Sequence, residues 1–391
     1  MAVNLAVNGI SLLAPLTGVG QYTYNLLGEI EKDPDFQPWF FYGPVWDTRR
    51  IDQATLESRL KAERVSRIRN LLRTFVPNSY AIARHLQQRY FSRGVRNHAI
   101  QLYHEPNFVP LRFDGPIINT IHDLSILRFP ETHPKERVRA IGDALPAAIE
   151  RSDVVITVSE FIAREIVETF SVDPSKVHAI HNGVSEQFRP REAQEVHDCL
   201  AKYGLTYGSY LLAVGTLEPR KNITSLIRAY EKIPSGMRRQ FPLALAGMKG
   251  WHYGEIGREM EPSVAAGEIK LLGYLSDDEL PQIYAGSSML VYPSIYEGFG
   301  LPPLEAMACG VPVIASNRAS LPEVVGDAGI LVEPYDIDAI AEAIMSLIDD
   351  AGERERRGRA GLERSRDFSW EKCASETMAV YKRVLDDQVL V

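Results

Sequence analysis

Twelve short apolar runs, separated by longer stretches with helical periodicity, limit the folds open to this chain. Most of the runs are rich in Val, Ile, Leu or Ala, and turn-forming residues separate them. Short runs that are apolar throughout are typical of parallel strands buried on both faces. The runs cover residues 3–7, 37–42, 100–103, 116–121, 153–158, 177–180, 210–214, 242–246, 269–272, 289–291, 311–315 and 330–332.

Apolar residues at helical spacing mark the stretches between these strands. We expect helices over residues 22–30, 136–150, 161–170, 223–232, 279–284, 337–347 and 370–385. The alternation of strand and helix predicts an α/β protein with parallel sheets. Two series of six strands favour two doubly wound, Rossmann-like domains over a (β/α)8 barrel, which requires eight units in one closed series.

The chain has 391 residues, more than one ordinary domain contains. Residues 184–208 contain Pro190, Gly204, Gly208 and a polar run, without the spacing of a long core helix. We therefore expect the domain boundary there. The expected units are an N-terminal domain over residues 1–185, a second domain over residues 205–370, and a C-terminal helix over residues 371–391 that returns to the first domain.

Composition excludes several classes of protein. With 45% hydrophobic and 24% charged residues, the chain is globular rather than disordered or coiled-coil. A net charge of −8 argues against nucleic acid as a partner of the whole chain. Its three cysteines lack metal-ligand spacing and fit a reducing compartment. Neither a signal peptide nor a run of 18 apolar residues is found, so we expect a cytoplasmic protein.

One segment departs from this acidic balance. From Arg59 to Arg96, ten Lys or Arg residues accompany a single acid, Glu63, which gives this basic segment a charge of +9 and the rest of the chain −17. Interleaved apolar residues such as Phe75 and Tyr90 suit an anionic membrane surface, where each nearby basic residue contributes about 1 kcal/mol. A solvated helix pair explains the charge equally well, and nucleic acid is a weaker alternative.

The strongest candidate site is a loop with two glycines, Gly298 and Gly300, between a strand and a helix. It follows the run over residues 289–291, and Pro302 and Pro303 favour a helix start just after it. Glycine backbone and a helix N-terminus can approach an anion closely. The sequence therefore predicts a phosphate-binding loop over residues 298–301.

Two glutamates, Glu297 and Glu305, flank this loop with seven residues between them. We place Glu305 in the first turn of the helix and expect the two carboxylates to lie at opposite ends of a phosphorylated ligand. Acids beside phosphate would repel it unless they accept hydrogen bonds from sugar or ribose hydroxyls. The structural alternative is that Glu305 favours the helix dipole and Glu297 caps a turn.

A second candidate is the segment over residues 215–222, which lies directly between a strand and a helix. Ligands of doubly wound domains bind at the carboxyl ends of strands. Arg220 can hold phosphate with two hydrogen bonds, and Lys221 supplies a compact charge. Both would stabilise the charge that develops on a departing nucleoside diphosphate. A surface turn with solvated cations is the alternative.

Two weaker signals follow strands in the N-terminal half. His122 comes after the run over residues 116–121, and it could bind a sugar hydroxyl or fill the core. Gly18 and Gly20 join the first strand to the first helix and could contact an anion or sugar. They are not a dinucleotide fingerprint, because Thr23 stands where its third glycine should be.

Together these motifs resemble the retaining glycosyltransferases of family 4, group 1, which have the GT-B fold of two Rossmann-like domains facing a central cleft. Glu297 and Glu305 match the E-x7-E motif of that family. Five further segments support the resemblance: residues 18–22, 122–123, 181–184, 215–222 and 273–275. Two stretches match nothing specific, residues 44–98 and 186–208. The resemblance implies transfer from a nucleotide-sugar donor, with no metal or other cofactor.

The resemblance also implies roles for individual residues. Glu305 would bind ribose hydroxyls, Glu297 and His122 would bind the transferred sugar, and Arg220 with Lys221 would hold the diphosphate. The other implied donor contacts are Gly18, Gly20, Thr216, Tyr274, Leu275, Gly298, Phe299, Gly300 and Leu301. Thr216 is a departure, since many relatives have Arg at that position.

Residues 103–107 resemble acceptor-side segments of lipopolysaccharide and exopolysaccharide mannosyltransferases, which implies that His104, Glu105 and Asn107 meet the acceptor. We therefore expect a retaining hexosyltransferase, with GDP-mannose as the first choice of donor and UDP-sugars next. Its acceptor would be a saccharide, lipid-linked or part of lipopolysaccharide, at the inner face of the plasma membrane. The alternatives are a GT-B epimerase or phosphorylase, and a non-catalytic protein that binds sugar nucleotides.

Overall fold

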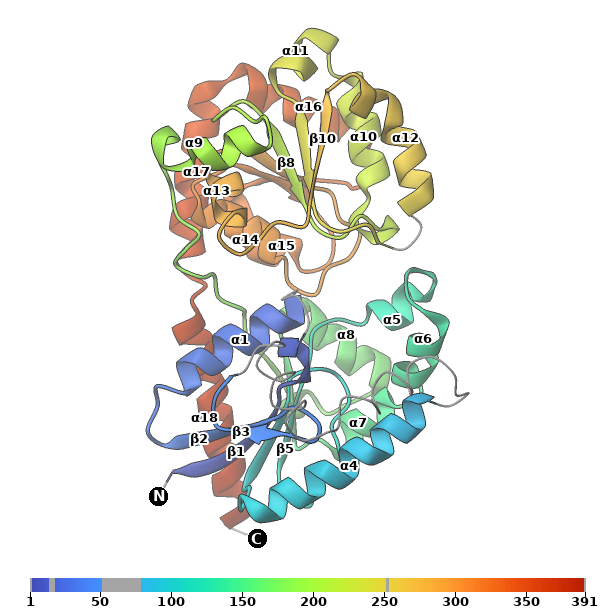
Figure 1. Ribbon diagram of the computed structural model, residues 1–391, viewed down its shortest axis with the longest axis vertical. Coiled ribbons are helices and arrows are strands. Elements are labelled where there is room, and N and C mark those ends of the chain that lie inside the picture. The colour runs from blue at the N-terminus through green and yellow to red at the C-terminus, as the bar shows by residue number, and fades with distance from the viewer. Residues whose placement is uncertain (1, 14–17, 51–78, 251–252, 390–391) are drawn as a thin grey trace.

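The computed structural model describes residues 2–13, 18–50, 79–250 and 253–389 of the chain. They form an N-terminal and a C-terminal half, each built on one sheet, and Figure 1 shows the C-terminal half above the N-terminal half. All twelve predicted strands are present, six of them in each sheet. The prediction of two doubly wound α/β units rather than one closed barrel is confirmed.

The first sheet has seven strands, and its order reverses beside β1, as in other doubly wound sheets. In spatial order the strands are β3 (Trp46–Asp47), β2 (Phe36–Phe41), β1 (Val3–Asn8), β4 (Leu102–Glu105), β5 (Ile117–Ile121), β6 (Val154–Thr157) and β7 (Val177–Ala179). All pairs are parallel except β2 with β3. The sequence did not predict β3, because two residues are too few to show a period.

The second sheet has six strands, all parallel, and reverses beside β8. Its spatial order is β10 (Ile269–Gly273), β9 (Leu243–Ala246), β8 (Leu211–Val214), β11 (Met289–Tyr292), β12 (Val313–Ser316) and β13 (Ile330–Val332). The reversal places the ends of β8 and β11 side by side, where a doubly wound sheet offers a crevice.

Helices cover both faces of each sheet, which is why most strand residues are apolar. Around the first sheet lie α1 (Gly18–Ile30), α4 (Ser79–Asn97), α5 (Ser125–Arg128), α6 (Lys135–Gly142), α7 (Leu145–Arg151) and α8 (Glu160–Phe170). Around the second lie α9 (Ala193–Lys202), α10 (Ile223–Lys232), α11 (Ser235–Gln240), α12 (Tyr253–Ala265), α13 (Leu280–Ala285), α14 (Leu301–Ala308), α15 (Leu321–Val325), α16 (Ile337–Asp349) and α17 (Ala351–Ser365).

Two sequence predictions need correction. The helix expected over residues 136–150 is divided into α6 and α7, because Pro146 cannot continue a helix but suits the first turn of a new one. The expected linker over residues 184–208 contains α9, whose Val196 and Leu200 are buried one turn apart. Two apolar residues at that spacing give a short packed helix that a search for long elements overlooks.

The last helix, α18 (Trp370–Val389), leaves the C-terminal half and packs along α1 and the first sheet (Figure 1). The hydroxyl of Tyr381 hydrogen-bonds Nδ1 of His104 at 2.6 Å, and Lys382 pairs with Asp35 at 2.7 Å. The chain therefore crosses between the halves twice, once after β7 and once between α17 and α18.

Candidate active site

A cavity of about 550 Å³ opens between the two halves. Its walls are the start of α1 and the segments that follow β4, β5, β6 and β7 in the N-terminal half, and the segments that follow β8, β9, β10 and β11 in the C-terminal half. Most of the predicted site residues line it: Gly18, His122, Thr216, Arg220, Lys221, Tyr274, Leu275, Glu297, Gly298, Phe299, Gly300, Leu301 and Glu305. The fold thus brings together residues that are far apart in the sequence, at the carboxyl ends of the strands.

Residues 293–300, the glutamate loop, connect β11 to α14. Gly300 precedes the helix with a φ of 118°, a backbone conformation that a side chain would strain. The helix begins at Leu301, with Pro302 in its first turn. Because it begins before the predicted start, Glu305 lies in the second turn and not in the first. Residues 298–301 line the cavity, so the N-terminal end of α14 faces it.

Glu297 is the centre of a buried polar cluster. Its Oε1 accepts hydrogen bonds from Lys221 Nζ at 2.6 Å, Tyr292 at 2.8 Å and Ser294 at 2.5 Å, and its Oε2 accepts one from Arg220 at 3.2 Å. Burial alone would raise the pKa of Glu297, but the Lys221 and Arg220 cations lower it to about 2. The carboxylate is therefore ionised at neutral pH although only 7% of the residue is exposed.

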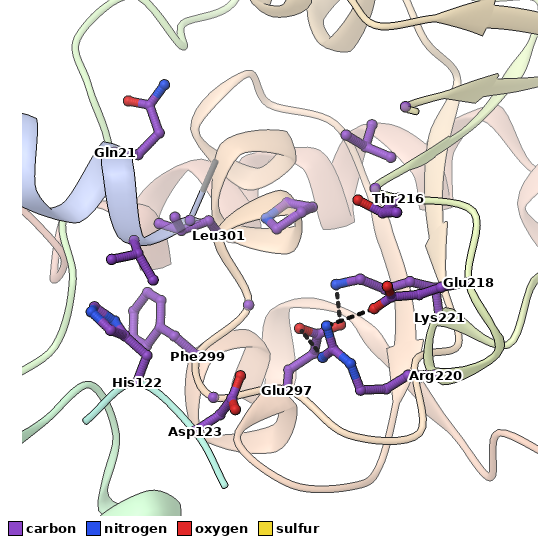
Figure 2. A pocket seen from close by; sticks show the side chains of 18 of the residues that line it. Gln21, His122, Asp123, Thr216, Glu218, Arg220, Lys221, Glu297, Phe299 and Leu301 are labelled. Carbon is purple, nitrogen blue, oxygen red and sulfur yellow. Dashed lines mark hydrogen bonds and ion pairs between the residues drawn. The ribbon is translucent and has the colours of Figure 1, made fainter. Parts of the chain in front are cut away.

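The two cations come from a short 3-10 turn after β8. Arg220 also donates to Glu218 at 2.9 Å (Figure 2). It donates as well to the carbonyl of Tyr296 at 2.7 Å. The turn is held by Asn222, whose φ is 56° and whose Nδ2 donates to Pro293 at 3.1 Å. The cations are thus attached to the glutamate loop by side-chain and backbone bonds.

This pairing limits how the cluster can bind an anion. Burial lowers the pKa of Lys221, the neighbouring Glu297 opposes that effect, and Arg220 adds to it. The ammonium has three hydrogens and, among the described residues, two partners, Glu297 and Tyr292, which leaves one hydrogen for a ligand. The Nε of Arg220 is buried without a partner in the described part of the chain. The cluster can stabilise added negative charge, but its own charges are already balanced.

On the opposite wall, His122 and Asp123 follow β5 and face the cluster across the cavity (Figure 2). The ring of His122 is 9% exposed, and its Nε2 lies 2.8 Å from the carbonyl of Pro106, so Nε2 is the donor. Burial lowers the pKa of His122, and the ring is neutral at pH 7. Its Nδ1 is therefore an acceptor that a sugar hydroxyl could use.

The residues predicted to hold the nucleoside lie at another end of the cavity. Tyr274 is 49% exposed and Leu275 is buried, after a turn at Gly273 whose φ is 70°. Burial, together with the charge of Asp277, raises the pKa of Glu305 to about 7. Glu305 thus changes charge near neutral pH, whereas Glu297 does not.

The predicted acceptor residues are not on the cavity. His104 and Glu105 lie in β4, a central strand covered on both faces, and are 0% and 1% exposed. His104 bonds to Tyr381 and Thr120, and Glu105 accepts from Tyr103 at 2.6 Å. This prediction is wrong for both residues, because α18 and α4 bury the strand.

Two further predicted contacts also lie away from the cavity lining. The backbone N–H of Asn107 donates to Glu105 at 3.1 Å, and Asn107 does not line the cavity. Gly20 is buried inside α1, whereas Gly18 at the start of that helix reaches the cavity.

Most of the basic segment lies outside the described residues, because positions 59–78 are not among them. Its described part belongs to α4, where Arg89, Tyr90, Arg93 and Arg96 are exposed. In the described ranges, no helix has the length and apolar character needed to cross a membrane.

Several residues of the site had no predicted role. Two of them, Tyr292 and Ser294, donate hydrogen bonds to Glu297. The third, Glu218, pairs with Arg220. All three lie within the two motifs that the sequence indicated. Their signal was polar side chains directly after buried strands. His133 and Arg137, which line the N-terminal wall, follow a short helix with no motif, and nothing in the sequence singled them out.

Family comparisons agree with this geometry. Residues 205–364 match the family model described as "Glycosyl transferases group 1", and residues 16–188 match "Glycosyltransferase Family 4". The chain is 38% identical over 369 residues to the O-antigen chain mannosyltransferase B of Escherichia coli, which covers 94% of this chain and 96% of that protein.

Solved structures share the fold at low sequence identity. Sucrose-phosphate synthase from Thermosynechococcus elongatus matches with a TM-score of 0.74 at 21% identity, over 98% of this chain and 100% of that one. WaaG, a glycosyltransferase involved in lipopolysaccharide biosynthesis, matches with a TM-score of 0.71 at 13% identity, over 97% and 99%. With both family models matched and a relative aligned along nearly its full length, this chain belongs to glycosyltransferase family 4, group 1, and has the GT-B fold.

Proposed function

We propose that this protein is a retaining α-mannosyltransferase that moves mannose from GDP-mannose to a saccharide acceptor carried on a lipid, in bacterial surface polysaccharide synthesis. The observation that carries this proposal is a 38% sequence identity to a protein named as an O-antigen chain mannosyltransferase, in an alignment that covers 96% of that protein. The cavity between the halves supports it, because its polar groups suit a nucleotide sugar.

The donor would lie mainly against the C-terminal half. Glu305 would accept hydrogen bonds from the ribose hydroxyls, with Tyr274 and Leu275 near the base. The diphosphate would meet the N-terminal end of α14 and the free hydrogen of Lys221. Glu297 would accept hydrogen bonds from the transferred sugar, and His122 Nδ1 would accept one from the other side of the cavity.

In the reaction the bond between the sugar C1 and the diphosphate oxygen breaks, and the acceptor oxygen bonds to C1 on the same face. The acceptor proton passes to an oxygen of the departing diphosphate, so no protein nucleophile is needed. Lys221 and the helix N-terminus would stabilise the charge that develops on that leaving group. We propose that no metal ion takes part, so a chelator should leave the rate unchanged.

The acceptor would enter along the N-terminal wall. There Asp123, Ser125, His133 and Arg137 line the cavity and offer hydrogen-bonding groups. We propose these in place of the buried residues of β4. A lipid-linked acceptor would also account for the basic segment, which would rest on the anionic inner face of the plasma membrane with α4.

A screen of nucleotide sugars tests the proposal directly. A ligand present at 100 times its dissociation constant stabilises a protein by about 2.7 kcal/mol, which a thermal melt detects. We expect the largest shift with GDP-mannose, followed by transfer of labelled mannose to a saccharide acceptor with the α configuration retained. A larger shift and turnover with UDP-glucose would establish a UDP-sugar enzyme instead. Binding without turnover of any donor would indicate a non-catalytic protein.

A further inference from the structure

Tyr296, in the glutamate loop of the C-terminal half, has its side chain inside the N-terminal half. The residue is only 5% exposed, and its ring contacts Phe129 and Phe161, with centroids 5.4 Å and 5.9 Å away. It belongs to the hydrophobic cluster formed by β5, β6, β7 and the helices on that face of the first sheet. The loop that carries Glu297 is thus seated in the other half of the molecule.

The hydroxyl of Tyr296 both accepts and donates a hydrogen bond in that position. It accepts a hydrogen bond from the backbone N–H of Leu124 at 2.9 Å and donates one to Glu165. Glu165 is itself buried and is held by Arg128 at 2.6 Å. Leu124 follows His122 by two residues, so the tyrosine bonds to the segment that carries the histidine of the opposite wall.

The backbone of Tyr296 is equally engaged, but with the other half of the site. Its carbonyl accepts a hydrogen bond from Arg220 at 2.7 Å, and the next residue is Glu297. Two residues later, the carbonyl of Gly298 accepts a hydrogen bond from Ser159 at 2.7 Å. The same few residues therefore contact the cation cluster on one side and the N-terminal half on the other.

We propose that Tyr296 is a positioning residue, which sets Glu297 and Arg220 in their working geometry only when its side chain is seated between Leu124 and Glu165. The proposal rests on the donor site described above. Tyr296 does not line the cavity and so would act through its neighbours, not by touching substrate. Docking of the two halves and assembly of the site would then be one event.

Simple packing is the competing explanation, and Tyr296→Phe separates the two, because it keeps the ring and removes only the hydroxyl. Positioning predicts that kcat falls about 10- to 100-fold, since small displacements of catalytic groups have effects of that size. The dissociation constant of the nucleoside diphosphate should rise by a smaller factor than kcat falls, because none of the hydrogen bonds found for Tyr296 among the described residues involves Glu305, Tyr274 or Leu275. Tyr335→Phe is the matched control, because that side chain is 60% exposed.

A second variant and a second readout keep the test independent of the proposed donor. Glu165→Gln should reproduce the loss in kcat, and the double variant should lose little more than either single variant. Hydrogen exchange at the Leu124 amide and along residues 293–300 should accelerate in Tyr296→Phe and stay unchanged in Tyr335→Phe. Hydrogen exchange needs no substrate. If the protein turned over no nucleotide sugar, the proposed function would be wrong, but hydrogen exchange would still test the role of Tyr296. A kcat within twofold of wild type, exchange that does not change, or equal losses in kcat and nucleotide affinity would each overturn the proposal.

Discussion

The Nζ of Lys221 lies 2.6 Å from Oε1 of Glu297, in an ion pair whose side chains are 13% and 10% exposed. The pair joins the turn after β8 to the loop after β11, and Arg220 adds a second cation to the same carboxylate. Removing one member of a buried pair leaves an unpaired charge, which costs far more than losing a surface contact. We therefore expect this ion pair to stabilise the folded protein as well as to take part in the chemistry of the site.

We expect Glu297→Gln to lower the free energy of unfolding by about 3–5 kcal/mol at pH 7, measured by urea denaturation. The pKa of Glu297 is lowered to about 2 from an ordinary value of 4.5. Its contribution is therefore fully present above pH 4.5 and is lost as the pH falls toward 2. The difference between wild type and variant should persist at pH 5 and shrink below it. Glu333→Gln, which breaks the exposed pair with Arg318, should cost less than about 1 kcal/mol.

Lys221→Ala should reduce turnover about 100-fold, because it removes a contact to the leaving group worth about 3 kcal/mol. The measurement is kcat with saturating donor, on protein shown by circular dichroism to be folded. Lys232→Ala serves as the control, since Lys232, the last residue of α10, forms an exposed pair with Asp338. Near-native turnover in Lys221→Ala would remove this lysine from the mechanism.

Donor affinity should depend on pH through Glu305. Its pKa is raised to about 7, so the side chain is mostly neutral below pH 7 and ionised above it. If the ionised form accepts hydrogen bonds from the ribose hydroxyls, donor affinity rises by up to about tenfold per pH unit as the pH increases toward 7. Above pH 7 the affinity levels off. Calorimetry with a nucleotide sugar measures this cleanly, because its diphosphate diester does not titrate near neutral pH. Glu305→Gln should bind more weakly at pH 8 and show no such dependence, and a variant that kept the wild-type profile would contradict the ribose role.

How much the sequence predicts differs between the fold and the site. The strands were predictable because burial on both faces leaves most of their residues apolar. Glu297, Glu305, Arg220 and Lys221 were predictable because each follows the carboxyl end of such a strand within a motif.

The errors have a common cause in tertiary packing. The family resemblance assigns His104 and Glu105 to the acceptor, but only the return of α18 shows that β4 is covered. The position of Tyr296 depends on how the two halves dock, and its partner Leu124 is 172 residues away. Local patterns carry no information about contacts at that separation.

The basic segment predicts salt-sensitive binding to vesicles that contain anionic lipid. Replacing Arg89, Arg93 and Arg96 by Gln should weaken that binding by about 1 kcal/mol for each residue near the surface. The matched control replaces three exposed arginines of the C-terminal half, Arg356, Arg359 and Arg366. Sedimentation with vesicles measures both sets. Equal binding to neutral vesicles, or equal losses in the two sets, would contradict membrane contact through this segment.

Gly298 packs closely against the backbone of the N-terminal half. A Cβ at this position would lie 1.9 Å from the carbonyl oxygen of His122, a backbone atom that cannot turn aside. Gly298→Ala should therefore separate the His122 segment from the glutamate loop, and a shift of about 1 Å is enough to reduce kcat about 100-fold. Affinity for the nucleoside diphosphate should fall by a smaller factor than kcat, because the residues proposed to bind the nucleoside all belong to the C-terminal half.

The control for this glycine is Gly236→Ala, since a Cβ at that helical position meets nothing within 4 Å. It should leave kcat unchanged and stabilise the protein slightly, because alanine has the higher helix propensity. Gly298→Ser should be as inactive as Gly298→Ala, because the clash comes from the Cβ itself. Full activity in either Gly298 variant would mean that turnover does not need the contact between His122 and the loop. The reaction would then take place with the two halves further apart than in this structure.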